Sequence, residues 1–387
     1  MSKFTTHKLE EIADVQTGPF GSQLHMSDYK KEGTPIITVE HLGENRIIHK
    51  NLPLVGDEDK NRLKKYILKE GDIVFSRVGS VDRCAYVSAK EDDWMFSGRC
   101  LRVRTNDKVD SRFLSFYFNQ ESFKEYIRMI AVGATMPSIN TTILSEVEIV
   151  LPPLKEQKLI AEILSSLDDK IFLLQRQNAT LEELAVSIFR QYFIEEVEDI
   201  WEIGILSDEF DFTMGQSPLG TDLNESRNGI IFYQGRSDFG FRFPTPRVYT
   251  TAPTRIAKPF DTLISVRAPV GDMNMAFEEC CLGRGVAAFR YKENNEYYSY
   301  TYYKLRSLME QIKQFEDNGS VFGSIGKDDF RKLENIIPPD ILVEKFQNEV
   351  KPIDDKIFLN TSQILTLTHI RNTILPKLIN GIAELKN

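Results

Sequence analysis

The sequence predicts an α+β protein made of two similar domains, each followed by a long helical region. Three observations carry this prediction: an internal repeat, short strand-like segments within each half, and a heptad pattern after each half. The hexapeptide Asp-Asp-Lys-Ile-Phe-Leu at 168–173 recurs at 354–359, an offset of 186 residues. The same offset places the two prolines 152–153 on 338–339. A frame that holds this long indicates a tandem duplication.

The upstream parts of the two halves diverge but keep their order. Residues 17–19 resemble 214–216, residues 98–101 resemble 283–286, and residues 71–77 resemble 260–267 with one residue inserted. This alignment pairs Arg99 with Arg284 and Arg77 with Arg267. The repeat divides the chain into a first domain at 1–150, a central helical region at 151–200, a second domain at 201–337 and a distal helical region at 338–387.

Each domain carries signals of both strands and helices. Segments 34–39, 73–75, 147–150 and 229–233 are rich in β-branched or aromatic residues and are bounded by Gly, Asp or Pro, as strands are. Between them, 111–128 and 296–315 place aromatic residues at helical spacing. No polar groups converge on these aromatic stripes, so we expect them in the domain cores rather than around a cofactor.

The two helical regions carry an apolar residue at every third or fourth position. The central seam spans 160–192 and the distal seam spans 346–378. Two helices with matching seams bury them against each other as a coiled coil. A helix of ~40 residues is roughly 60 Å long, which is longer than ordinary globular domains require.

Polar residues interrupt both seams. Asn178 is either a buried residue that fixes the register of the coiled coil or a solvated position where the seam frays, and Asn360 has the same two interpretations. Arg371 is a further polar intrusion. Pro352 and Pro376 are candidate breaks in the distal helix, because proline removes a backbone donor.

Composition places the chain among globular proteins. Its 387 residues suffice for two or three domains, and 41% hydrophobic with 27% charged residues excludes a disordered or fibrous chain. No apolar run approaches the ~18–20 residues that span a bilayer, and no signal-peptide pattern is present, so we expect a cytoplasmic protein. The four cysteines lack CxxC spacing, which indicates reduced thiols, and the five histidines lack the spacing of zinc ligands.

The charge distribution permits a local basic surface. The net charge of −9 argues against an indiscriminate binder of polyanions. Residues 151–200, however, hold 10 acidic against 5 basic side chains, whereas 1–150 hold 22 against 21. Each domain can therefore gather positive charge on one face.

Signatures of catalysis are missing from the sequence. Segment 323–328 comes nearest to a phosphate-binding loop, but Val321 occupies the first glycine position and Asp328 replaces the Ser or Thr. Segment 151–154 lacks the polar acceptor and the aromatic residue of the Asp/Asn-Pro-Pro-aromatic motif of amino-methyltransferases. We expect the Asp pairs 168–169 and 354–355 on solvated helix faces, compensated by the lysine that follows each pair, rather than at a metal. A duplicated scaffold without such motifs favours recognition over catalysis.

The order of these features resembles the specificity subunits of type I restriction-modification systems. The resemblance rests on the domain–helix–domain–helix order, on Leu-Pro-Pro-Leu-Lys-Glu-Gln at 151–157, and on segments 76–80 and 265–271. It covers essentially the full length and implies two target-recognition domains whose helical regions pack as an antiparallel coiled coil. The distal start at 338–344 lacks the Leu-x-Glu-Gln of the central start, which puts the equivalence of the two partner contacts in doubt.

The resemblance also implies a function without catalysis. Two methyltransferase subunits would dock on the helices, bring S-adenosylmethionine and flip adenines into their own pockets, with restriction subunits added where the system has them. This chain would bind no cofactor or metal itself. Two domains on a helical spacer would read two half-sites of double-stranded DNA across a fixed gap. The alternative is a coiled-coil scaffold whose domains bind proteins, and only DNA binding should weaken steeply with salt.

Candidate DNA contacts are polar or aromatic side chains near turns, since Arg suits guanine, Gln suits adenine, and hydroxyl groups suit phosphates. They are Thr17, Phe20, Ser22, Gln23, Arg77, Ser80 and Arg83 in the first domain, and Gln216, Ser217, Gln234, Arg236 and Arg267 in the second. The candidate partner contacts are apolar residues of the helical regions outside the seams: Phe172, Leu173, Phe189, Phe193, Phe358 and Leu359. The repeated turns 133–138 and 319–324 suit a structural or phosphate-binding role common to both domains.

Overall fold

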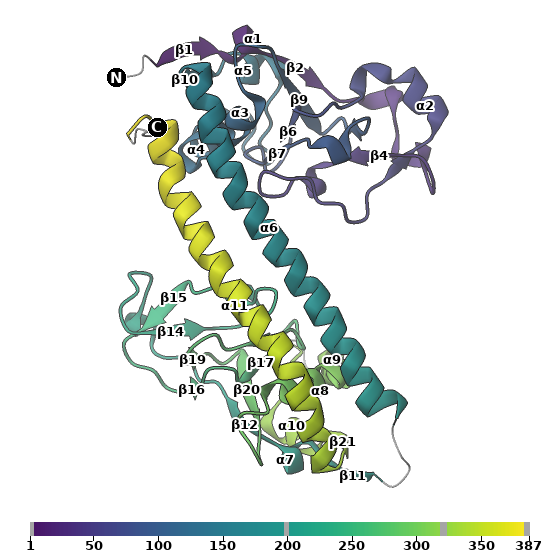
Figure 1. The fold of residues 1–387 in the computed structure, drawn as a ribbon, viewed down its shortest axis with the longest axis vertical. Coiled ribbons are helices and arrows are strands. Elements are labelled where there is room, and N and C mark those ends of the chain that lie inside the picture. Colours follow the sequence, from purple (N-terminus) through teal and green to yellow (C-terminus); the bar gives the residue numbers. More distant parts are fainter. Residues whose placement is uncertain (1–3, 197–200, 318–322, 383–387) are drawn as a thin grey trace. The chain divides into compact units, whose positions relative to one another are not determined.

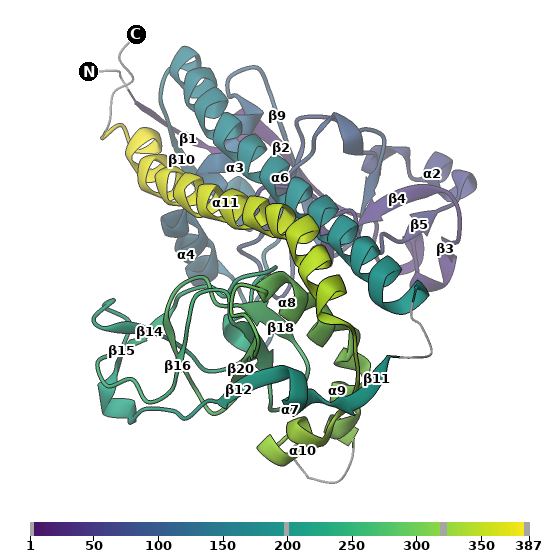
Figure 2. The ribbon, with the colours of Figure 1, turned by 60° about the horizontal axis from the view of Figure 1, so that its bottom comes forward.

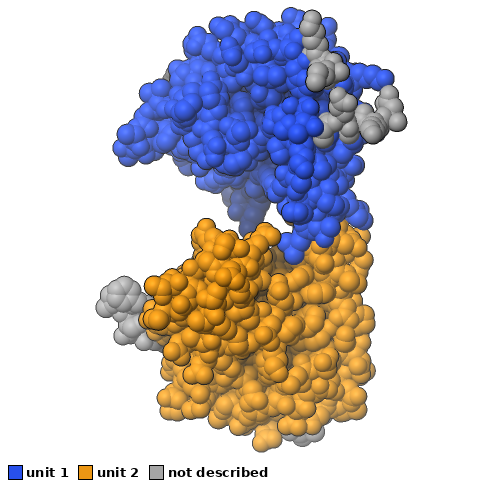
Figure 3. Space-filling model, turned by 90° about the vertical axis from the view of Figure 1, so that its left-hand side faces the viewer, with its two compact units in different colours: residues 1–173, 364–387 blue, residues 174–363 orange. Residues whose placement is uncertain are grey.

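The structure is a computed structural model that describes residues 4–196, 201–317 and 323–382. It divides into two compact units, one made of residues 1–173 and 364–387 and the other of residues 174–363 (Figure 3). Each unit contains one α+β domain together with a part of each long helix.

Unit 1 is built on a four-stranded sheet in the order β2-β9-β6-β7, a second sheet in the order β3-β5-β4-β8, and the ribbon β1-β10 (Figure 1). Its strands are β1 (Thr5–Lys8), β2 (Ala13–Thr17), β3 (Tyr29–Lys30), β4 (Thr34–Ile37), β5 (Leu54–Val55), β6 (Ile73–Ser76), β7 (Cys84–Tyr86), β8 (Met95–Phe96), β9 (Cys100–Thr105) and β10 (Glu148–Leu151). Its short helices are α1 (Leu9–Ile12), α2 (Asp57–Arg62), α3 (Ser111–Phe118), α4 (Glu121–Ile130) and α5 (Thr141–Ser145).

Unit 2 repeats this plan with a four-stranded sheet β12-β20-β17-β18, a five-stranded sheet β13-β15-β14-β19-β16 and the ribbon β11-β21. Its strands are β11 (Glu202–Ile205), β12 (Phe210–Met214), β13 (Leu223–Asn224), β14 (Ile230–Tyr233), β15 (Val248–Thr250), β16 (Ile256–Ala257), β17 (Thr262–Ser265), β18 (Met273–Met275), β19 (Cys280–Leu282), β20 (Val286–Tyr291) and β21 (Glu334–Ile337). Its short helices are α7 (Leu206–Glu209), α8 (Tyr298–Ser307), α9 (Met309–Asp317) and α10 (Lys327–Lys332).

The aromatic stripes lie in the cores, as predicted, but each spans two helices. The first divides into α3 and α4, and the second into α8 and α9. Phe113 and Phe123 are buried in the core of unit 1, and Tyr302 and Ile312 in the core of unit 2. All four cysteines are buried and free, and burial raises the pKa of the Cys84 and Cys100 thiols to about 12.

The long helices are α6 (Leu154–Arg190), which continues into a π-helical turn (Gln191–Glu195), and α11 (Asp340–Ile379). In each unit they lie side by side (Figures 1 and 2). In unit 2, Asn178 bonds to Asn360 and Phe189 packs on Phe346, so the helices run antiparallel there. The predicted breaks are wrong, because α11 continues through Pro352 and Pro376. The last predicted residues of the central region, 197–200, lie outside the described residues.

The polar residues on the seams are buried. Asn360 Nδ2 donates to Asn178 Oδ1 at 2.9 Å, and Asn178 Nδ2 donates to Thr361 Oγ1 at 3.3 Å. Both asparagines are nearly inaccessible to solvent. Of the two interpretations, the structure therefore supports the buried residue that fixes the register.

The first Asp of each repeated pair, Asp168 or Asp354, is buried, so the expectation of a solvated helix face is wrong for these two residues. Arg371 on α11 donates to Asp168 at 2.9 Å, and Arg242 lies 3.2 Å from Asp354. Both carboxylates are buried, and burial raises their pKa while the neighbouring guanidinium acts against the rise. A buried carboxylate needs such a partner, and an exposed lysine cannot supply it.

Candidate nucleic-acid interface

Three loops of unit 1 meet at one end of its main sheet. They are residues 17–20 after β2, 76–80 after β6 and 97–99 before β9, and we call them loop cluster 1. The Gly18 N–H donates to the Cys100 carbonyl at 3.2 Å, and the Arg77 N–H donates to the Arg99 carbonyl at 2.8 Å. A Cβ on Gly18 would clash with the Ser97 carbonyl, so glycine is required for this close approach.

Loop cluster 1 presents an aromatic side chain beside arginines. Phe20 is 58% exposed, and the Arg77 guanidinium lies 5.7 Å from the centre of its ring. Arg77 Nη1 also donates to the Gly98 carbonyl at 3.3 Å. Ser80 and Arg99 are exposed, whereas Thr17 is half-buried at the end of β2. The predicted residues Thr17, Phe20, Arg77 and Ser80 thus belong to one surface.

The matching loops of unit 2 also meet at the end of its four-stranded sheet. They are residues 214–217, 266–267 and 283–285, and together with residues 234–235 after β14 of the five-stranded sheet we call them loop cluster 2. The Gly215 N–H donates to the Val286 carbonyl at 2.9 Å, and the Gly283 N–H donates to the Tyr233 carbonyl at 2.8 Å. Among the predicted residues, Gln216, Gln234 and Arg267 are exposed here. Ser217 accepts a hydrogen bond from the backbone N–H of Arg284 at 3.2 Å.

Strand pairing sets the correspondence between the two clusters, and it differs from the sequence alignment by one residue. Ser76 pairs with Cys100 in unit 1 and Ser265 pairs with Val286 in unit 2. The residues that follow Ser76 and Ser265 then correspond, so Arg77 matches Val266 rather than Arg267. By the same register Gly98 matches Arg284, and Arg99 matches Gly285. The alignment of these arginines with each other is therefore wrong.

The clusters carry positive charge that the described residues do not neutralise. Arg99, Arg267 and Arg284 are exposed, and none forms an ion pair with a carboxylate within the described ranges. Arg236, in contrast, pairs with Asp272 at 2.7 Å. Free guanidinium groups on exposed loops suit contacts with DNA phosphates and with guanine.

Two predicted contacts serve the fold instead of pointing freely to solvent. Gln23 accepts a hydrogen bond from the Tyr66 hydroxyl at 2.7 Å, and Arg83 donates to the Leu42 carbonyl. The side chain of Ser22 lies outside the described residues. The turn at 133–138 joins loop cluster 1 through the Gly79 N–H, which donates to the Pro137 carbonyl at 2.9 Å. Of its counterpart at 319–324, residues 319–322 lie outside the described residues.

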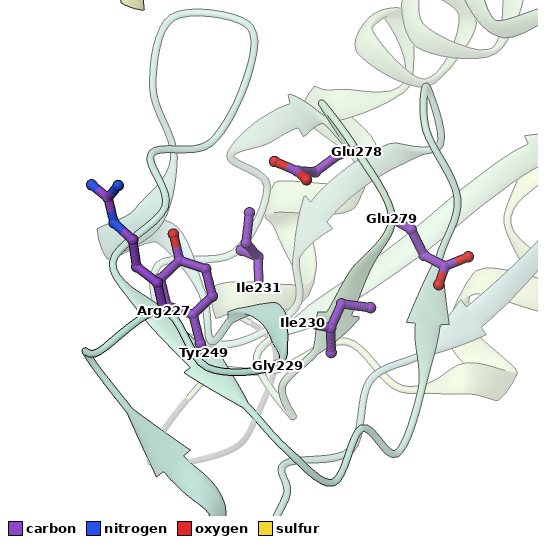
Figure 4. A pocket seen from close by; sticks show the side chains of 7 residues that line it. All are labelled: Arg227, Gly229, Ile230, Ile231, Tyr249, Glu278 and Glu279. Carbon is purple, nitrogen blue, oxygen red and sulfur yellow. The ribbon is translucent and has the colours of Figure 1, made fainter. Parts of the chain in front are cut away.

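A pocket of about 480 Å³ in unit 2 does not bring charged side chains together in this way. It is lined by Arg227, Gly229, Ile230, Ile231, Tyr249, Glu278 and Glu279. The polar ends of Arg227, Glu278 and Glu279 point in different directions (Figure 4). Within the part of the chain that the structure describes, no group of His, Cys, Asp and Glu could hold a metal ion, and no helix is long and apolar enough to cross a membrane.

Comparisons with known proteins decide the family. The family model of the type I restriction modification DNA specificity domain matches residues 1–183 and 252–367. This chain is a type I restriction-modification specificity subunit. A relative from Methanocaldococcus jannaschii, named "Putative type I restriction enzyme MjaX specificity subunit", is 31% identical over 379 residues, which cover 92% of this chain and 88% of the relative. The MjaIX specificity subunit of the same organism is 26% identical, over 97% of this chain and 92% of its own length.

A solved structure has the same fold. The crystal structure of a type I restriction-modification S subunit from M. genitalium matches with a TM-score of 0.65 at 18% identity, covering 100% of this chain and 97% of the other. The predicted fold class is thus confirmed, and so is the prediction of a non-catalytic subunit for DNA sequence recognition.

The candidate partner contacts of the specificity subunit divide by exposure. Phe189 and Phe193 are buried in the core of unit 2, so the chain itself covers them. Phe358 packs on Phe277 at 4.7 Å between ring centres and is half-buried. Phe172 lies under Arg46, whose guanidinium is 4.7 Å from the ring centre. Leu173 and Leu359 remain exposed, at 47% and 55%.

Two exposed arginines of the specificity subunit escaped the sequence-based selection of contacts. Arg99 and Arg284 lie in the loop clusters, although neither is in a segment with a recognised DNA-binding motif. The signal that could have found them is the repeat itself, because both flank the glycines that recur in the two domains. The sequence alone, however, does not show that Arg99 and Arg284 occupy different positions in their clusters, because this follows only from the strand register.

Proposed function

We propose that this specificity subunit reads a bipartite DNA target, with loop cluster 1 contacting one half-site and loop cluster 2 contacting the other. The observation that carries this proposal is the construction of both clusters from equivalent loops that display different exposed side chains. Cluster 1 displays Phe20 and Arg99 beside the half-buried Arg77, and cluster 2 displays Gln216, Arg267 and Arg284. Common loops on one scaffold with different side chains suit the reading of two different sequences.

We further propose that two methyltransferase subunits dock on the long helices and supply S-adenosylmethionine. The repeat supports two equivalent contacts, because its offset matches exposed apolar residues on α6 and α11. Leu173 matches Leu359, and Leu184 matches Ile370. Eleven residues make about three helical turns, so the members of each stripe share a face of their helix. A duplicated apolar stripe suits two copies of one partner.

The proposed complex acts on chromosomal DNA in the cytoplasm, with restriction subunits added where the system has them. The lengths of α6 and α11 would set the gap between the half-sites. The helices would fix the length of that gap without contacting its bases.

The test is to co-express the chain with a type I methyltransferase subunit from the same genome and to map N6-methyladenine by single-molecule sequencing. We expect one motif of two short halves around a fixed gap. Leu173→Asp should remove one methyltransferase from the purified complex, and Leu359→Asp should remove the other. Leu365→Asp is the matched control, because Leu365 is 46% exposed and lies about 120° around α11 from Leu359. A methyltransferase that binds all three variants equally would contradict the docking proposal, and the absence of a motif would contradict the bipartite reading.

A further inference from the structure

The two loop clusters differ most at one pair of positions that touch each other. Counting from the corresponding glycines Gly18 and Gly215, Phe20 of unit 1 occupies the position of Ser217 in unit 2. The strand register places Gly98 of unit 1 at the position of Arg284. In each domain the loop after β2 or β12 therefore contacts the loop before β9 or β20, and different residues make this contact in the two domains.

At this contact, the position with the larger side chain is not the same in the two domains. In unit 1 a Cβ added to Gly98 would lie 2.4 Å from the Pro19 carbonyl oxygen and 2.8 Å from the Phe20 Cβ, so the close approach of the two loops requires glycine at 98. In unit 2 the small Ser217 faces Arg284, and its hydroxyl accepts the Arg284 backbone N–H at 3.2 Å. A large side chain is thus present once in each domain, on opposite loops.

The large side chain points to solvent in both domains but has a different chemistry. Phe20 is 58% exposed, and one face of its ring contacts the guanidinium of Arg77, which also donates to the Gly98 carbonyl. Arg284 is exposed and forms no ion pair with the described residues. An exposed phenyl ring gives an apolar contact, whereas a free guanidinium gives two parallel donors.

We propose that this pair of positions is a specificity determinant in each domain: Arg284 reads guanine through its O6 and N7 atoms, and Phe20 contacts the methyl group of thymine. Both pairings follow from the groups that the bases present in the major groove. Arg77 acts as a positioning residue for Phe20. The inference rests on the proposed function, and it adds which residue of each domain discriminates and which base it selects.

The test compares Phe20→Ala and Arg284→Ala in the complex with the methyltransferase. Binding is measured on oligonucleotides in which one base pair of the mapped motif is changed at a time. We expect Arg284→Ala to abolish discrimination at one guanine of the second half-site, where the unaltered protein discriminates by roughly 5- to 150-fold. Phe20→Ala should abolish discrimination at one thymine of the first half-site. Each variant should leave the other half-site unchanged.

Phe241→Ala and Arg331→Ala are the matched controls, because both residues are exposed and lie outside the clusters. The double variant Ser217→Phe/Arg284→Gly places the residues of unit 1 in unit 2, and we expect it to fold and to replace a guanine preference by a thymine preference. A motif from the unaltered complex that none of these variants changes would overturn this inference alone. A uniform loss of affinity on all sequences would assign the residues to phosphates and overturn it too. If the unaltered complex yields no motif, the proposed function fails and this inference with it.

Discussion

The buried Arg242 should be the most sensitive single position in unit 2. It donates through Nε and Nη2 to Glu182 on α6 at 3.0 and 2.7 Å and to the Tyr303 hydroxyl at 2.5 Å, and it lies 3.2 Å from Asp354 on α11. Its guanidinium also stacks on Tyr302 at 3.8 Å from the ring centre. Replacement by methionine would leave the buried Asp354 without a cationic partner, whereas Glu182 would keep its ion pair with Arg306. Removal of one partner from a buried ion pair costs about 3–5 kcal/mol of unfolding free energy.

Tryptophan fluorescence can report this loss, because the chain has two tryptophans, Trp94 in unit 1 and Trp201 in unit 2. In a Trp94→Phe background, Trp201 reports the unfolding of unit 2 by urea or by heat. Arg242→Met should lower the melting temperature by on the order of 10 °C. Arg236→Ala is the matched control: Arg236 is 60% exposed in its ion pair with Asp272, so its loss should cost about 1 kcal/mol or less.

The pH dependence tests the cause of the loss. Burial raises the pKa of Asp354, and Arg242 acts against that rise. Without Arg242 the pKa of Asp354 rises further, and the folded variant then binds a proton that the unfolded chain has released. Its stability therefore falls as pH rises and recovers as pH falls. We expect the deficit of Arg242→Met to shrink between about pH 8 and pH 5.5 and the triple variant Arg242→Met/Glu182→Gln/Asp354→Asn to recover most of it. An equal deficit at both pH values would refute this reasoning.

Three further predictions follow from other contacts. Asn178→Leu leaves Asn360 without its partner on the seam and should cost about 1–3 kcal/mol in urea unfolding, whereas Asn178→Leu/Asn360→Leu should be at least as stable as the unaltered chain; the reverse order would contradict the role in register. Burial raises the pKa of Glu209, so the unaltered chain should lose stability relative to Glu209→Gln as pH rises above the ordinary carboxyl range, and a difference independent of pH in thermal melts would argue against this. Arg99→Ala and Arg267→Ala should each reduce the slope of log Kd against log salt by about 1 in fluorescence anisotropy with DNA, and an unchanged slope would place these arginines away from phosphates.

The helical seams were predictable because heptad spacing translates directly into burial. Leu164 and Leu174 of the central seam are buried, as are Val350 and Ile357 of the distal seam. The expected break at Pro352 failed for a physical reason. Proline costs a helix one backbone hydrogen bond, but buried neighbours on both sides of it keep this part of α11 packed in the core of unit 2.

The details of the loop clusters could not be read from the sequence. The dipeptide Gly-Arg occurs at 98–99 and at 283–284, and its recurrence aligned Arg99 with Arg284. Only the pairing of β6 with β9, and of β17 with β20, shows that the true register differs by one residue. The ion pair of Asp354 with Arg242 could not be predicted from the sequence either. Arg242 lies on a loop more than a hundred residues away in the chain, and no local sequence pattern indicates a contact across that separation.

The best-preserved stretch of the repeat also acquires a physical explanation. In unit 1 the hexapeptide 168–173 receives Arg46 from the domain, which bonds to Asp169 at 2.5 Å and covers Phe172. In unit 2 the identical hexapeptide 354–359 receives the loop with Arg242 and Phe243, whose ring lies 5.7 Å from that of Phe358. Each domain thus reaches the same six residues with its own arginine. An exchange of residues 1–150 for the corresponding domain of another specificity subunit should therefore keep this contact only if the incoming domain has an arginine at the position of Arg46.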